Sequence, residues 1–300
     1  MRAPLFEAVP NFSEGRDAAR ISRIVSSVRA VPGIRVLDLH TDPDHNRSVL
    51  TFAGEEEPIL RAAVTLAAAC AAEIDLSAQA GVHPRMGSLD VLPFVPLENA
   101  TMDGAIRLAR LAGESIGSLG YSVFLYERAA TSEHRRNLAE VRRGGYEGLT
   151  ERIKDPLWHP DYGPNALDPR LGAVAVGARD FLIAFNAYLD TANVEIARQV
   201  ARKVRERDGG LPGLKALGLE VAGRAQVSMN VTDIEAAPLP VVLEAVRAAA
   251  AALGARIEWT ELVGLMPLEA LLQTARHHLA LRDFDGRHVL EAGLWRSEDG

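Results

Sequence analysis

The sequence predicts an α+β fold, because the order strand-helix-strand-strand-helix-strand occurs twice along its 300 residues. This is the order of the ferredoxin-like fold, an antiparallel sheet with helices on one face. An irregular stretch over 155–170, which holds four prolines, separates the two occurrences. We therefore expect two ferredoxin-like (βαββαβ) subdomains, an N-terminal one at 1–178 and a C-terminal one at 179–300.

The N-terminal subdomain follows from changes in apolar periodicity along the chain. Its predicted strands are 5–9, 34–39, 48–52 and 89–95, and its predicted helices are 17–29 and 56–74. Ile21, Ile24, Val25 and Val28 recur at helical spacing and give the first helix an apolar face. This half is extended by a helix over 103–118, a strand over 122–126 and a charged helix over 132–143.

The C-terminal subdomain repeats the same order without a residue-level repeat. Its predicted strands are 181–188, 214–221, 226–231 and 256–262, and its predicted helices are 191–207, 238–253 and 267–280. The two middle strands read as a hairpin across Ala222–Ala225. A fold of this kind hosts many activities, so function has to come from particular residues.

Composition excludes several classes of protein. The net charge of −7 without a basic tail argues against nucleic-acid binding. The longest apolar run, Ala62–Ala72, falls short of the roughly twenty residues that cross a bilayer, and no signal peptide is evident. The single cysteine, Cys70, fits a reducing compartment, and we expect a cytoplasmic protein. Only three basic residues are lysines, so anions must be met largely by arginine.

The most informative segment is GVHPRMGSLD, residues 81–90, between a predicted helix and a predicted strand. His83 titrates near neutral pH and can transfer protons. Pro84 restricts the backbone of the histidine before it, and Arg85 offers a planar fork to a carboxylate. Residue types alone also fit a histidine at a helix end beside a surface arginine.

Three further segments contain polar side chains that could bind a ligand. In HTDPDHNR, residues 40–47, the spacing of acids and imidazoles matches no zinc or calcium pattern, and a capped turn explains it as well. PNFSEGR, residues 10–16, resembles an anion-binding turn only weakly, because it has one glycine. In the long loop, Trp158 and Tyr162 could stack on a flat ring, or the loop could be a stiff linker.

These segments occur in order with others: VPNFSEGR, DPDHNRSVLTF, GVHPRMGSLDVLPFVPL, DYGP, GARDFLIAFN, and QVSMNVTD followed by ELVGLMPLEALL. Together they resemble glutamate formiminotransferase, the formiminotransferase domain of folate metabolism, over nearly the whole chain. The resemblance implies transfer of a formimino group from N-formiminoglutamate to N5 of tetrahydrofolate, with release of glutamate, in histidine degradation. It also implies a homodimer, with tetrahydrofolate bound as a co-substrate between two subdomains.

The resemblance places the family's catalytic histidine on His83. It places the folate-contacting stretch on the loop, for which we take Tyr162, Gly163, Pro164, Asn165, Ala166, Leu167, Asp168, Pro169, Arg170, Leu171 and Gly172. The cyclodeaminase of bifunctional members is expected in another protein. Some members carry an aspartate where this chain has His40, so the acid that supports His83 is left open among Asp38, Asp42 and Asp90.

The remaining substrate-binding candidates come from the matched motifs. Arg16, Arg47 and Arg85 are candidates for the substrate carboxylates, and Asn11 and Asn46 for the formimino nitrogen or the pterin edge. Asp38, His40 and Asp90 complete the set. We expect no metal and no redox cofactor. Formyl transfer between 5-formyltetrahydrofolate and glutamate, and a non-catalytic folate-binding module, are the alternatives.

Overall fold

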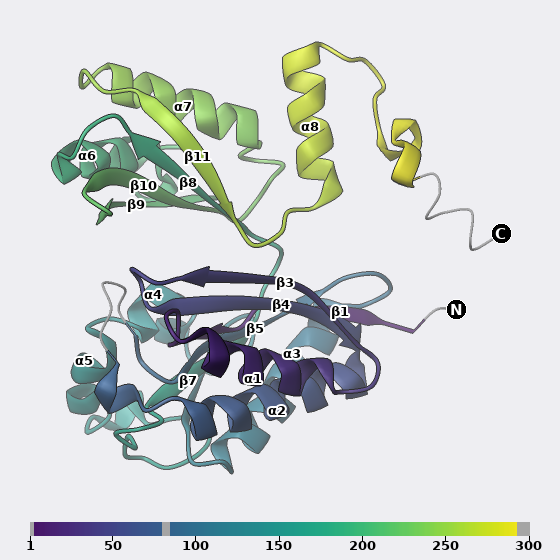
Figure 1. Ribbon diagram of the computed structural model, residues 1–300, viewed down its shortest axis with the longest axis vertical. Helices are drawn as coiled ribbons and strands as arrows, with labels where there is room; N and C mark the ends of the chain where they lie inside the picture. The colour runs from purple at the N-terminus through teal and green to yellow at the C-terminus, as the bar shows by residue number, and fades with distance from the viewer. Residues whose placement is uncertain (1–2, 80–84, 293–300) are drawn as a thin grey trace. The chain divides into compact units, whose positions relative to one another are not determined.

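The computed structural model describes residues 3–79 and 85–292 (Figure 1). It divides into two compact units, Met1–Asp180 and Phe181–Gly300. Each unit combines helices with a mainly antiparallel sheet, which confirms the predicted α+β class. Each helix in the described part of the chain is too short or too polar to cross a membrane.

The N-terminal unit is built on a sheet in the ferredoxin-like order β3, β4, β1 with β2, then β5, all antiparallel. Its strands are β1 (Leu5–Ala8), β2 (Asn11–Phe12), β3 (Ile34–Asp42), β4 (Arg47–Glu55), β5 (Leu89–Pro96), β6 (Ser122–Glu127) and β7 (Ala173–Ala178). The predicted first strand is interrupted after β1, at Val9 and Pro10, because proline has no N–H to give to a sheet. Beyond β5 the sheet continues in parallel with β7 and then β6.

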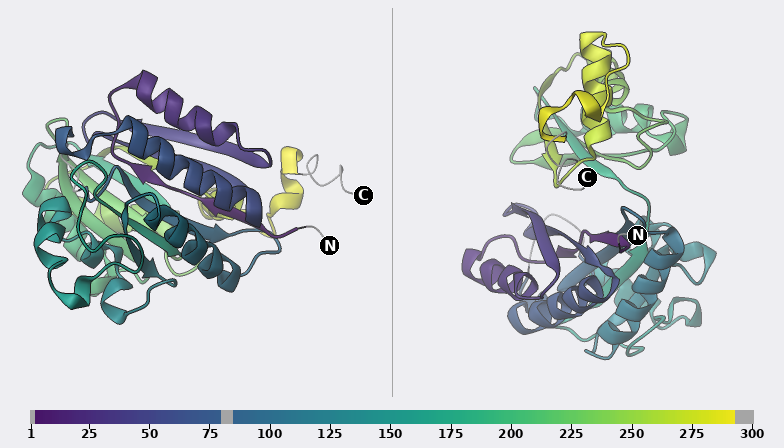
Figure 2. Two further views of the ribbon diagram at one scale, coloured as in Figure 1. Left: turned by 90° about the horizontal axis from the view of Figure 1, so that it is seen from below. Right: turned by 90° about the vertical axis from the view of Figure 1, so that its right-hand side faces the viewer.

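Helices cover this sheet on both faces. The helices are α1 (Ala18–Arg29), α2 (Glu56–Glu73), α3 (Met102–Gly117), α4 (Leu138–Val141) and α5 (Gly145–Arg152). The first three pack on one face, over a core that includes Phe6, Leu50 and Phe94, and α1 and α2 run side by side (Figure 2). Residues of α4 and α5 join a second core with β5, β6 and β7 on the other face.

The charged helix predicted over 132–143 is wrong. The chain forms a 3₁₀ turn, Glu133–Arg135, and then the single turn α4. Asn137 causes the break, because its side chain caps α4 by accepting the N–H of Ala139 and its own backbone is extended. Neither α5 nor β7 was predicted. The residues of β7, AVAVGA, are all apolar or glycine, so they give no alternation of apolar and polar side chains.

The C-terminal unit has the complete ferredoxin-like order, β11-β8-β10-β9, with every pair antiparallel. Its elements are β8 (Ile183–Leu189), α6 (Val194–Val204), β9 (Leu214–Val221), β10 (Arg224–Val231), α7 (Leu239–Ala251), β11 (Ile257–Val263) and α8 (Leu268–Leu279). The predicted hairpin is confirmed: Ala222 and Gly223 both have positive φ, the conformation of a tight turn between twisted strands.

The long loop predicted over 155–170 belongs to the N-terminal unit. A buried ion pair with Arg135 and a hydrogen bond from β6 hold it there. One oxygen of Asp161 accepts hydrogen bonds from the N–H of Leu125 and from Arg135, both at 2.7 Å. The side chains of Asp161 and Arg135 are only 9% and 6% exposed. Breaking such a pair leaves a buried charge uncompensated, so the loop's position depends on it.

We predict that Arg135→Met lowers the free energy of unfolding by about 3 kcal/mol, the cost of leaving a buried carboxylate without its partner. Arg136→Met is the matched control, because Arg136 pairs with Glu133 on the surface, where ion pairs contribute about 0–1 kcal/mol. Urea denaturation of both variants measures the difference. Equal stability of the two variants would show that the Asp161 pair does not hold the loop.

Candidate functional site

A β-bulge places a buried carboxylate at the end of the segment that contains His83. In the pairing of β2 with β5, Asn11 lies opposite Val91 but Phe12 lies opposite Leu89, so Asp90 is the extra residue. A bulge re-aims the side chain of its extra residue, and bulges are frequent beside functional sites. Asp90 accepts the N–H of Met86 at 2.8 Å and Arg142 at 2.5 Å.

The backbone of residues 85–87 is fixed by several separate hydrogen bonds. The carbonyl of Arg85 accepts an N–H at 2.7 Å, that of Met86 an N–H at 2.8 Å, and that of Gly87 a hydroxyl at 2.7 Å; the donors are Tyr146, Ala173 and Ser13. A Cβ at Gly87 would stand 2.0 Å from the carbonyl oxygen of Ala173, so only glycine fits. His83 itself lies outside the described residues.

Positive charge gathers around Asp90. The pKa of Arg47 is lowered to about 10, chiefly by burial and also by the positive charge of Arg142, while Asp90 and Asp42 oppose the shift. Arg47 therefore stays protonated at neutral pH, and two guanidinium groups lie near one buried carboxylate. Such an excess of guanidinium charge suits the carboxylates of an anionic ligand.

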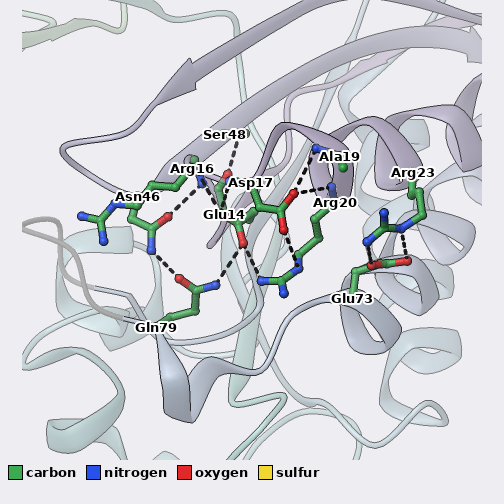
Figure 3. Close-up of polar contacts among 11 residues, drawn as sticks. Glu14, Arg16, Asp17, Ala19, Arg20, Arg23, Asn46, Ser48, Glu73 and Gln79 are labelled. Carbon is green, nitrogen blue, oxygen red and sulfur yellow. Dashed lines mark hydrogen bonds and ion pairs between the residues drawn. The ribbon is translucent and has the colours of Figure 1, made fainter.

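A second buried carboxylate, Glu14, organises the turn between β2 and α1 (Figure 3). It accepts hydrogen bonds from four donors at 2.8–3.2 Å: the N–H groups of Arg16 and Asp17 and the side chains of Arg20 and Gln79. Burial alone would raise the pKa of Glu14, but these hydrogen bonds outweigh it and hold the pKa below its usual value. Glu14 is thus a fixed anion.

Asn46 links this turn to the neighbouring segments. Its backbone is left-handed, with φ of 49°, and its side-chain oxygen accepts the N–H of Gly15 at 2.9 Å. Its amide group donates to Gln79, which in turn donates to Glu14 (Figure 3). Gln79 directly precedes residues 80–84, so this network fixes the chain on the other side of that segment.

The other substrate-binding candidates lie in the same unit with different surroundings. The Nε of Arg16 donates to the carbonyl of Pro43 at 2.8 Å. The side chain of Asn11 donates to the carbonyl of Val9 at 3.3 Å. Asp38 and His40 lie on β3, opposite Thr51 and Val49 of β4.

The guanidinium of Arg85 is weakly paired within the described residues. Its only ion pair within the described residues, with Glu147, is long, at 3.9 Å, and Glu147 is largely exposed. Its Nε is buried without a hydrogen-bond partner in the part of the chain that the structure describes. An unpaired buried donor of this kind is costly, and the Nε atoms of Arg20, Arg135 and Arg152 share this feature.

The proposed folate stretch, 162–172, is shaped by two glycines in left-handed conformations. A Cβ at Gly163 would meet the carbonyl oxygen of Tyr121 at 2.0 Å, and one at Gly172 would meet that of Met86 at 2.3 Å. Asp168 caps the turn between them by accepting the N–H groups of Arg170 and Leu171. Gly172 forms a bridge with Gly87, which joins this stretch to the segment after residue 84.

The two aromatic rings of the long loop are occupied by contacts within the unit. Tyr162 packs against the glycine face of α3, at Gly113 and Gly117. Trp158 lies under the guanidinium of Arg152 at 4.2 Å and meets the ring of His134 edge-on.

Sequence patterns did not single out Arg142, Glu14, Gln79 or Glu7. Glu7 is 4% exposed on β1; burial raises its pKa, partly offset by the positive charge of Arg179. No spacing rule links Arg142 to Asp90, Gln79 to Glu14 or Glu7 to Arg179, because each partner comes from a distant segment. Within residues 3–79 and 85–292 no group of three or more His, Cys, Asp or Glu side chains is placed to hold a metal ion.

Comparisons with known proteins cover both units. The family model described as the formiminotransferase domain, N-terminal subdomain, matches residues 5–179, and that of the formiminotransferase domain matches 184–287. A protein of Thermoplasma acidophilum named glutamate formimidoyltransferase is 43% identical, with 96% of each chain covered. One of Streptococcus pyogenes with the same name is 40% identical, covering 97% of this chain and 99% of its own.

The formimidoyltransferase-cyclodeaminase of Sus scrofa is 41% identical over 90% of this chain, which spans 52% of that longer protein. These matches confirm the resemblance stated from the motifs. This chain therefore belongs to the formiminotransferase family.

Proposed function

We propose that this chain is a glutamate formimidoyltransferase that acts in histidine degradation. It transfers the formimino group of N-formimino-L-glutamate to N5 of tetrahydrofolate and yields 5-formiminotetrahydrofolate and glutamate. One observation carries the proposal: two relatives with this name match at 40% and 43% identity along nearly their whole length and nearly the whole of this chain.

The charges of the N-terminal unit support this choice of substrates. Both substrates carry carboxylates, whereas the protein has a net charge of −7. Arg142 pairs with Asp90, Arg47 lies within electrostatic range of both, and Arg85 has a buried donor without a partner among the described residues. Local positive charge of this kind concentrates anions in spite of the overall charge.

In the proposed reaction, N5 of tetrahydrofolate attacks the formimino carbon and loses its proton. The bond from that carbon to the glutamate nitrogen then breaks, and this nitrogen gains a proton. One imidazole, that of His83, takes the first proton and returns it to the leaving nitrogen, so the transfer balances without a covalent enzyme intermediate. A proton relay of this kind contributes about 10²–10⁴-fold to a rate.

The proposal includes further expectations from the family resemblance. Residues 162–172 contact the folate, with Gly163 and Gly172 allowing close approach of the backbone. The protein acts as a cytoplasmic homodimer, and a separate cyclodeaminase consumes its product. No metal takes part in the proposed steps.

We predict that the protein uses N-formiminoglutamate at least about a hundredfold faster than N-formylglutamate, because a site that accepts a hydrogen bond from the C=NH group is left with an unpaired polar group by a formyl oxygen, which can only accept. Separation of the folate products by chromatography measures both rates. A faster reaction with the formyl donor would favour the formyl transferase alternative. Binding of tetrahydrofolate without product from either donor would favour a non-catalytic module.

His83→Ala is predicted to lower turnover by at least about a hundredfold, since general acid–base catalysis contributes on that scale. The Kd for tetrahydrofolate, measured by calorimetry, should stay within a few-fold because the substitution removes no carboxylate partner. Near-normal turnover of this variant would exclude His83 as the proton relay.

Arg85→Ala is predicted to raise the KM of an anionic substrate and to leave kcat nearly unchanged, as expected when uniform binding is lost. Steady-state kinetics with each substrate varied in turn shows which carboxylate it meets. Arg23→Ala serves as the control, because Arg23 is exposed and pairs with Glu73 on the surface. An unchanged KM for both substrates would contradict a role of Arg85 in binding.

A further inference from the structure

The corner between α4 and α5 holds both ends of the segment that follows His83. Arg142 is the first residue after α4, and its side chain forms an ion pair with Asp90. Gly144 and Gly145 have φ of 78° and 63°, and they reverse the chain so that the N–H of Tyr146 donates to the carbonyl of Arg85 at 2.7 Å. This corner therefore binds residue 85 through its backbone and residue 90 through an ion pair.

Asp90 also restrains the backbone four residues before it, at Met86. Its side chain is 2% exposed, and its second oxygen accepts the N–H of Met86 at 2.8 Å. Met86 is completely buried, and its carbonyl is bonded to the N–H of Ala173 at 2.8 Å. A shift of Asp90 would thus move the backbone three residues from His83.

The Arg142–Asp90 pair is the part of this arrangement that a side-chain substitution can remove. The hydrogen bonds from Tyr146 and Ala173 join backbone groups, so substitution of Arg142 or Asp90 does not remove their donors or acceptors. Removal of either charge leaves the other one buried near Arg47, whose pKa already reflects the positive charge of Arg142 and the negative charge of Asp90. The segment then loses its electrostatic anchor at position 90.

We propose that Arg142 and Asp90 are positioning residues for His83 and act through the fixed backbone of residues 85–90. The inference rests on the proposed function, in which His83 relays the proton between two nitrogens. A relay requires its imidazole within hydrogen-bond reach of both, and displacement by about 1 Å costs about a hundredfold in rate. Neither residue needs to touch a substrate for this effect.

The test compares kcat and KM in Asp90→Asn and Arg142→Met. We expect kcat to fall at least about tenfold while the KM values of both substrates stay within about threefold, because geometry rather than binding is lost. The control is Arg23→Met, which removes an ion pair of 2.7 Å that is exposed on the same unit (Figure 3). Its kcat should stay within twofold of the unaltered protein.

Each substitution is also combined with His83→Ala. Positioning residues act only through His83, so we expect the combined variants to be no slower than His83→Ala alone. A further loss of kcat of the same size in that background would overturn the proposal, because it would show a general structural role. Unchanged kcat in Asp90→Asn and Arg142→Met would overturn it as well.

Arg142→Lys keeps the proposal testable if Asp90→Asn fails to fold. It retains the charge and lacks the guanidinium fork, so we expect a folded protein with a kcat reduced about fivefold and unchanged KM. Full activity of Arg142→Lys together with full activity of Arg142→Met would contradict the proposal. Full activity of His83→Ala would exclude His83 as the relay, whereas no product from N-formiminoglutamate with the unaltered protein would refute the proposed function, so the failures are distinguishable.

Discussion

A single buried carboxylate, Asp90, ties the N-terminal sheet to the segment that contains the proposed catalytic residue. A carboxylate that is 2% exposed is tolerated only if its charge is paired and its oxygens accept hydrogen bonds. Both conditions are met, by Arg142 and by the N–H of Met86. The strand, the corner after α4 and the segment from residue 85 therefore have to adopt one mutual arrangement, because any other leaves a buried charge unpaired.

The near absence of lysine gives this arrangement a particular chemistry. Three lysines serve the whole chain, so the cations around Asp90 and Glu14 are guanidinium groups. Guanidinium donates in a plane and in fixed directions, whereas an ammonium group is a rotating point charge. The same property that lets Arg142 fix Asp90 suits Arg47 and Arg85 to the role proposed for them, the recognition of planar carboxylates.

The sequence predicted the architecture well, because hydrophobic periodicity depends on neighbours along the chain. The helix at α1 and the hairpin of β9 and β10 were found in this way. Parallel strand β7 was not, since its pairing with β5 and β6 involves distant segments and small residues.

The site was predicted less completely, for a related physical reason. Asp90 and Arg85 belong to a recognisable motif. Arg142 is one of four charged residues within 140–147, a composition typical of a protein surface. Its importance lies in a partner 52 positions away. Gln79 was missed because its role depends on hydrogen bonds with Glu14 and Asn46, which are distant in the sequence. Contacts between distant segments have no signature in local spacing.

Glu7 and Glu14 show what decides the charge of a buried acid in this unit. Both are at most 4% exposed, so desolvation opposes ionisation of both. Glu14 has four donors, which lower its pKa, whereas one oxygen of Glu7 has no partner in the described part of the chain and its pKa is raised. The four donors of Glu14 therefore outweigh its desolvation, whereas at Glu7 desolvation prevails.

These opposite shifts have opposite consequences for stability. Glu14, with a lowered pKa, stabilises the fold above the pKa of an unfolded glutamate, and this contribution is lost as the pH falls through its folded pKa. The contribution of Glu7, with a raised pKa, is full below the unfolded pKa and is lost as the pH rises through its folded pKa. A fall in pH therefore weakens the hydrogen bonds of Glu14, including the one to Gln79. The same fall removes the cost of burying a charged Glu7 on β1. Protonation of Glu14 therefore loosens both the turn between β2 and α1 and the chain at Gln79, which meet at this carboxylate.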